Sequence, residues 1–89
     1  MVTSIILLNV KRQKINDVAN LLTDRSEVSE VYSVSGKYDL IAIVRVAEND
    51  ELSEFVTNHL AKIKGIKKTD TMLAFKAYSK HDLEVMFSI

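Results

Sequence analysis

The spacing of hydrophobic side chains alternates between two periods along this chain, and the order of the periods predicts its fold. Residues 2–10 form a β-branched and aliphatic run that is too short for a buried helix, so a strand is expected there. Residues 15–22 place apolar side chains at helical spacing instead. Two further strand-like segments follow at residues 28–35 and 40–46. The first half of the chain is therefore predicted to run strand, helix, strand, strand.

The second half of the chain returns to a helical period and then to a strand period. Asn49 or Asp50 can cap a helix whose acidic first turn suits the helix dipole, and this helix carries one apolar stripe of Leu52, Phe55, Val56, Leu60 and Ile63. Gly65 stands where a left-handed C-terminal cap is needed, and a strand is expected from residue 66 to about residue 78. A faint internal repeat supports this order, because sliding the first half over the second superimposes their apolar positions.

The resulting order, β-α-β-β-α-β, predicts an α+β protein with the ferredoxin-like split β-α-β arrangement. In that arrangement the sheet is antiparallel, its first and third strands are central, and both helices cover one face. The chain has no Pro and only two Gly, so no linker is expected. We expect one domain over residues 1–78, with residues 79–89 as its C-terminal tail.

Both faces of the two predicted central strands are apolar. Residues 5–8 are all aliphatic, and Arg45 alone interrupts the run at residues 40–46. An antiparallel sheet with one face in water would alternate apolar with polar side chains, and two helices can cover only one face. The sequence therefore predicts a homodimer in which two sheets pack face to face, as an α/β sandwich or barrel. The alternative is a monomer whose tail folds back over the open face.

Composition excludes several classes of function. Twelve basic and twelve acidic residues give a formal net charge of zero, which argues against non-specific nucleic-acid binding. The central strands are aliphatic where an RNA-binding domain of this topology would place aromatic side chains. Cysteine is absent, no secretion signal is recognisable, and no apolar run approaches the roughly 20 residues of a membrane span. We expect a cytoplasmic protein with no membrane partner.

Patterns typical of catalysis or metal binding are not recognisable in the sequence. His59 and His81 are the only histidines, and they are not spaced as a metal pair. The chain carries no nucleophile elbow, phosphate-binding loop or zinc-protease motif. General acid–base catalysis needs at least two positioned titratable groups, and only Asp39 stands in an unusual setting. The sequence thus predicts a protein that is not an enzyme and that uses no cofactor.

The segment "SGKYD" between the second and third predicted strands carries the parts of a binding site. Gly36 permits a positive φ angle, Tyr38 offers an apolar wall with a hydroxyl, and Asp39 can pair with an ammonium group. Because free loop N–H groups can hold a carboxylate, these parts suit a free amino acid. Thr69 and Thr71 share one strand face and can supply an opposing wall. The alternative is a simple turn in which Asp39 bonds backbone N–H groups of its own loop.

One family shares these motifs. The pattern V-x-x-V-Y-x-V-S-G-x-Y-D-L at residues 28–40, an acidic helix start, and G-I-x-x-T-x-T-x-L at residues 65–73 resemble the effector-binding (RAM) domain of Lrp/AsnC transcription regulators. The resemblance covers residues 2–77. It implies dimers that pair sheet to sheet and assemble further, often into octamers, with amino-acid effectors bound between dimers at the glycine-containing loop. The matching positions here are Gly36, Lys37, Tyr38, Asp39, Thr69, Asp70 and Thr71.

The chain departs from such regulators at its N-terminus. It begins directly at the first predicted strand, without a helix-turn-helix segment, and so resembles stand-alone members of the family. We therefore expect no direct DNA binding. The expected function is a small-molecule sensor that modulates transcription or metabolism by assembling with itself or with full-length Lrp/AsnC regulators. Two alternatives are a small dimeric α/β-barrel enzyme and a purely structural oligomerisation module.

Overall fold

The computed structural model describes residues 1–78 and residue 80. Four strands form one antiparallel sheet in the spatial order β2-β3-β1-β4, so the first and third strands are central, as predicted. Their bounds are β1 (Val2–Val10), β2 (Val28–Ser33), β3 (Leu40–Val46) and β4 (Ile66–Ala74). The predicted C-terminal tail, residues 79–89, falls outside the described residues apart from residue 80, and it stays a prediction.

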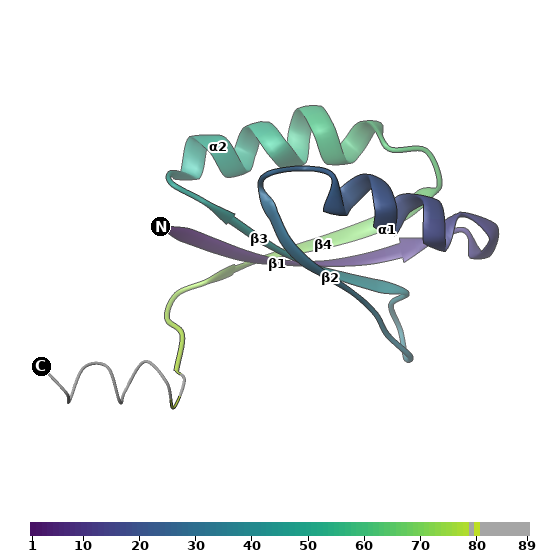
Figure 1. The fold of residues 1–89 in the computed structure, drawn as a ribbon, viewed down its shortest axis with the longest axis horizontal. Coiled ribbons are helices and arrows are strands. Elements are labelled where there is room, and N and C mark those ends of the chain that lie inside the picture. Colours follow the sequence, from purple (N-terminus) through teal and green to yellow (C-terminus); the bar gives the residue numbers. More distant parts are fainter. Residues whose placement is uncertain (79, 81–89) are drawn as a thin grey trace, which may run out of the picture.

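Two helical segments cover one face of this sheet, and the opposite face carries no helix among the described residues (Figure 1). The first segment consists of the short 3-10 turn η1 (Arg12–Lys14) and helix α1 (Ile15–Thr23). The second comprises α2 (Asn49–Glu54), the π-helical turn η2 (Phe55–His59) and the 3-10 turn η3 (Leu60–Lys62). The predicted α+β, ferredoxin-like β-α-β-β-α-β fold is confirmed. None of the described helices is long and apolar enough to cross a membrane.

Two strands are shorter than the sequence predicted. β2 ends at Ser33 because the chain reverses soon afterwards, at Gly36, whose φ angle is 116°. β4 ends at Ala74, which pairs with Thr3. β1 starts at Val2, so beyond residue 75 a longer β4 would have no residue of β1 with which to pair.

The core lies between the sheet and the helices. Alternate residues of β1 point into it, and Ile6 and Leu8 are fully buried there. Ser4 is buried on the same face, and its hydroxyl donates a hydrogen bond to the carbonyl oxygen of Met72 at 2.8 Å. That bond satisfies a polar group that would otherwise be costly to bury.

The second helical segment is not the regular α-helix that its apolar stripe predicted. In an α-helix, five residues advance the chain by about 500°, so Phe55 and Leu60 would lie roughly 140° apart around the axis. The π-helical turn η2 closes that gap, because the N–H of Leu60 donates to the carbonyl oxygen of Phe55. Both side chains are 1% exposed as a result.

The uncovered sheet face is apolar, as predicted. Cross-strand pairing places Ile5 beside Ile43 and Leu7 beside Ile41, and side chains of directly paired residues share a face. All four are only partly buried, and they form a continuous aliphatic surface, which we call the open face. Met72 of β4, 46% exposed, extends it beside Ile5.

Candidate functional site

Gly36 makes the turn between β2 and β3. Its φ angle of 116° lies in the region that side-chain-bearing residues rarely adopt. Among the described residues, no atom outside the immediate neighbours of Gly36 lies within 4 Å of the position that a Cβ would take, so the backbone angle alone requires glycine here. Gly36 and Lys37 are both exposed, which leaves the tip of the loop open to a ligand.

Asp39 fastens the loop to the end of β1. Its carboxylate oxygen Oδ2 accepts a hydrogen bond from the N–H of Val10 at 2.8 Å. Its own N–H donates to the carbonyl oxygen of Leu8 at 2.9 Å, and its carbonyl oxygen accepts from the N–H of Val34 at 3.0 Å. The side-chain carboxylate therefore bonds to a backbone N–H of β1 rather than to a backbone N–H of its own loop. Asp39 holds the loop in position.

Tyr38 connects the loop to β4. Its hydroxyl donates a hydrogen bond to Oδ2 of Asp70. This bond raises the pKa of Tyr38 above its ordinary value of 10.0, with burial and the negative charge of Asp70 acting in the same direction. Asp70 pairs with Leu7 and therefore lies on the open face of the sheet. Tyr38 and Asp70 bring an aromatic ring and a carboxylate together at the edge of that face.

The two predicted threonines lie on the other side of the sheet. Thr69 pairs with Leu8 and Thr71 pairs with Ile6, and both partners are buried beneath the helices. Thr69 also lines a small cavity of about 190 Å³ together with Val56 and Leu60. Within one copy of the chain, the structure therefore brings Gly36, Lys37, Tyr38, Asp39 and Asp70 to one corner and leaves Thr69 and Thr71 on the helix-covered face.

Two features of this corner were missed by reasoning from the sequence. The bond between Tyr38 and Asp70 joins residues far apart in the chain, and only the resemblance had marked Asp70. Strand alternation could have separated Asp70 from its threonine neighbours, since successive side chains point to opposite faces. Nothing in the sequence pointed to Val10 as the partner of Asp39.

The described residues 1–78 and 80 hold no group of three or more His, Cys, Asp and Glu side chains that could bind a metal ion.

Comparison with known proteins identifies the family. Residues 3–83 match the family model described as the Lrp/AsnC ligand binding domain. The chain belongs to this family. The HTH-type transcriptional regulator FL11 of Pyrococcus furiosus is 32% identical over 79 residues, which are 89% of this chain and 52% of that protein. The Lrp/AsnC domain described here thus spans about half the length of the curated relatives it matches. Such relatives are transcription regulators and not enzymes, in agreement with the sequence-based prediction.

Solved structures agree with this assignment. TTHA0845 from Thermus thermophilus is 35% identical with a TM-score of 0.83, and the match covers 90% of this chain and 100% of that one. A more distant structure shares the fold alone. It is the transcriptional regulator NMB0573 from Neisseria meningitidis, solved as an L-Met complex, with 16% identity, a TM-score of 0.80, and coverage of 88% of this chain and 52% of that one.

Proposed function

We propose that this Lrp/AsnC ligand-binding domain senses a free amino acid at the corner formed by the loop and β4. The observation that carries the proposal is the bond between Tyr38 and Asp70 beside an exposed glycine turn. Asp70 can take the ammonium group, while Lys37 and the loop N–H groups can take the carboxylate. The ring of Tyr38 can contact the apolar part of the ligand.

The site is proposed to be completed by a second copy of the chain. The open face is a continuous aliphatic surface, and such surfaces in single copies mark association sites. Two sheets packed face to face would bury it at the usual spacing of about 10 Å. Because Asp70 lies on this face, a ligand there is close to the proposed contact between copies.

Ligand binding is proposed to act on transcription by changing the assembly of the protein. A ligand held between copies favours the assembled state by mass action, by about 2.7 kcal/mol when its concentration is one hundred times its dissociation constant. We propose that dimers assemble into higher oligomers such as octamers, and that full-length Lrp/AsnC regulators in the cytoplasm can join them. Transcription would then respond to the amino acid through the composition of these assemblies.

Calorimetric titration with a panel of free amino acids tests the proposal, with light scattering to follow the mass. L-methionine is tried first, since it is the ligand named for NMB0573. Saturable binding should be lost in Tyr38→Ala, which removes the ring, and in Asp70→Asn, which removes the charge. Tyr78→Ala is the matched control, because Tyr78 is 80% exposed and lies beyond the end of β4. Heat that is equal in all variants would place the ligand elsewhere.

A purely structural role is the second candidate, favoured by one observation. Asp39 already has a backbone partner, so part of the loop serves to hold its own conformation. No heat with any amino acid, together with an oligomer that dissociates in Tyr38→Phe, would establish this second function instead.

A further inference from the structure

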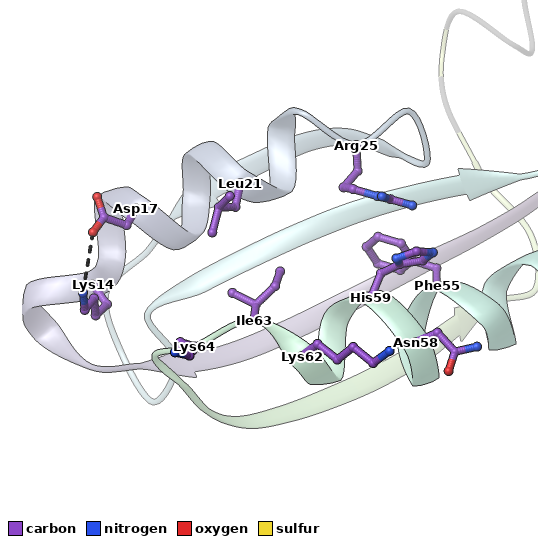
Figure 2. Close-up of a pocket in the computed structure, with 10 residues that line it drawn as sticks. All are labelled: Lys14, Asp17, Leu21, Arg25, Phe55, Asn58, His59, Lys62, Ile63 and Lys64. Carbon is purple, nitrogen blue, oxygen red and sulfur yellow. Dashed lines mark ion pairs between the residues drawn. The ribbon is translucent and has the colours of Figure 1, made fainter.

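A groove runs between the two helical segments on the face of the molecule away from the open face. It has a volume of about 570 Å³ and is lined by residues of α1 and of the segment from α2 to η3 (Figure 2). Small-molecule sites in proteins commonly have volumes of about 300–1,000 Å³. The face-to-face dimer proposed above would leave this groove exposed, because it lies on the outer, helical side.

The groove combines an apolar middle with polar ends. Leu21 and Ile63 lie opposite each other in its middle, and Leu21 is 52% exposed although it is a large aliphatic side chain (Figure 2). At one end the guanidinium group of Arg25 points toward the rings of His59 and Phe55 (Figure 2). These two rings lie 6.4 Å apart between centroids and are tilted by 40°. An apolar, ring-sized group would find contacts on both sides of the groove.

The lining is cationic although the chain as a whole is neutral. Four lining side chains are Lys or Arg and one is acidic, whereas basic and acidic residues balance over the full sequence. The acidic residue is Asp17, whose Oδ2 atom lies 4.0 Å from Nζ of Lys14. Among the described residues, Lys62 and Lys64 form no ion pair. Charge complementarity therefore selects an anionic occupant.

Arg25 is held ready to contact such an anion. Its Nε and Nη2 atoms donate to the carboxylate of Glu27 at 3.2 Å and 3.0 Å. Burial acts to raise the pKa of Glu27, but hydrogen bonds from Arg25 and from its own backbone, and the nearby positive charges, lower it overall. The ionised Glu27 fixes the guanidinium plane, and a guanidinium group has five N–H donors, so further donors remain for a ligand.

The π-helical turn shapes the same wall. It turns Phe55 and Leu60 into the core together, and it is the stretch that carries Asn58 and His59 to the groove. Such turns are rare and occur frequently at functional sites. The turn and the groove are thus one local feature.

We propose that this groove is a second ligand site, which takes a small organic carboxylate with an apolar, ring-sized body. The carboxylate contacts Arg25, with Lys62 contributing charge, and the body lies against Leu21 and Ile63. The site is separate from the loop corner, because the groove is on the helix-covered side and Asp70 is on the open face.

The test uses the full chain and three probes of graded chemistry. Phenylacetate carries both the ring and the charge, phenylacetamide lacks the charge, and acetate lacks the ring. Calorimetry should give saturable binding of phenylacetate that is at least tenfold tighter than that of the other two. The ring proton signals of His59 should shift in NMR spectra during the titration, and a His81→Gln variant distinguishes them from the signals of the other histidine.

Variants separate the groove from other surfaces. Arg25→Gln and Leu21→Gln should each weaken phenylacetate binding about tenfold, and Lys62→Gln should weaken it about threefold. Arg12→Gln is the matched control, since Arg12 is exposed on η1 and does not line the groove, and it should bind normally. Leu21→Gln and Lys62→Gln alter side chains that are exposed at the surface, so they keep the test valid if Arg25→Gln unfolds.

Three results would overturn the proposal. The first is equal binding of phenylacetate and phenylacetamide, which would remove the role of the charge. The second is phenylacetate binding that survives Arg25→Gln and Leu21→Gln but is lost in Tyr38→Ala, which would move the ligand to the loop corner. The third is an acidic helical peptide that binds the groove while phenylacetate does not, which would make the groove a protein-docking surface.

Discussion

Replacing Asp39 by alanine removes the side-chain bond that fastens the loop to β1, and it is expected to lower the free energy of unfolding by about 2 kcal/mol. Hydrogen bonds to charged groups contribute roughly 1.5–3 kcal/mol. The donor, the N–H of Val10, belongs to a residue that is 2% exposed, so water replaces the lost acceptor poorly. For a domain of this size, about 2 kcal/mol corresponds to a fall in melting temperature of roughly 8–16 °C.

Urea unfolding followed by circular dichroism measures this loss. All variants are compared at one subunit concentration, because association couples stability to concentration. Asp39→Asn retains a hydrogen-bond acceptor without the charge, and it should lower the free energy of unfolding by about 1 kcal/mol. The matched control is Asp24→Ala, which removes an exposed carboxylate near the end of α1 and should stay within about 0.5 kcal/mol of wild type.

The same variants distinguish the two roles that the sequence left open for Asp39. If Asp39→Ala unfolds at the same urea concentration as Asp24→Ala but alone loses amino-acid binding, the carboxylate is a ligand group and its contact with Val10 stabilises nothing. The reasoning from the hydrogen bond would then be refuted.

Three further predictions follow from the geometry. Gly36→Ala should lower the free energy of unfolding by about 1–2 kcal/mol, from the backbone angle alone. Gly65→Ala should lower it more, because the added Cβ would also lie 2.8 Å from the Cβ of Lys14. Urea unfolding of the two variants compares these losses. Absorbance at the tyrosinate band, with the other two tyrosines changed to phenylalanine, should show Tyr38 ionising above pH 10 and at lower pH in Asp70→Asn. Because the folded-state pKa of Tyr38 is raised, its bond to Asp70 stabilises the fold below pH 10 and is lost as pH rises through that pKa. Ile43→Glu should give monomers in sedimentation experiments without loss of helix signal, and unchanged mass would contradict the proposed dimer face.

The element order could be predicted from the sequence because helices and strands impose different hydrophobic periods. β1 and β3 were predicted with the bounds that the structure shows, and both their apolar faces were recognised. The ends of β2 and β4 were not, since a strand ends where its neighbour ends or where the chain reverses, and neither is a local property. The π-helical turn escaped prediction for a related reason, because the burial of both Phe55 and Leu60 depends on how the helical segment packs on the sheet, which local spacing does not show.

The site was predictable as a loop but not as a set of contacts. Asp39 meets Val10 where the register of β1 with β4 shifts between Asn9 and Val10, and a single sequence does not show such an irregularity. The placement of Asp70 and the threonines on opposite faces follows from alternation, but which face meets the loop depends on the register with β1. The groove between the helices depends on tertiary packing, and its basic lining is spread over separate segments of the chain.

The contact between Tyr38 and Asp70 gives the proposed sensor a switch that can be observed directly. An ammonium group that takes Asp70 as its counter-ion competes with the tyrosine hydroxyl for the same carboxylate. Ligand binding should then free the Tyr38 hydroxyl and loosen the tie between the loop and β4. At neutral pH, the Cζ chemical shift of Tyr38 should move toward that of an exposed tyrosine as the amino acid saturates, while that of Tyr78, which lies beyond the end of β4, should stay constant. Saturable binding with an unchanged Tyr38 signal would mean that the ammonium group is held without Asp70, and the recognition chemistry proposed for this corner would be wrong.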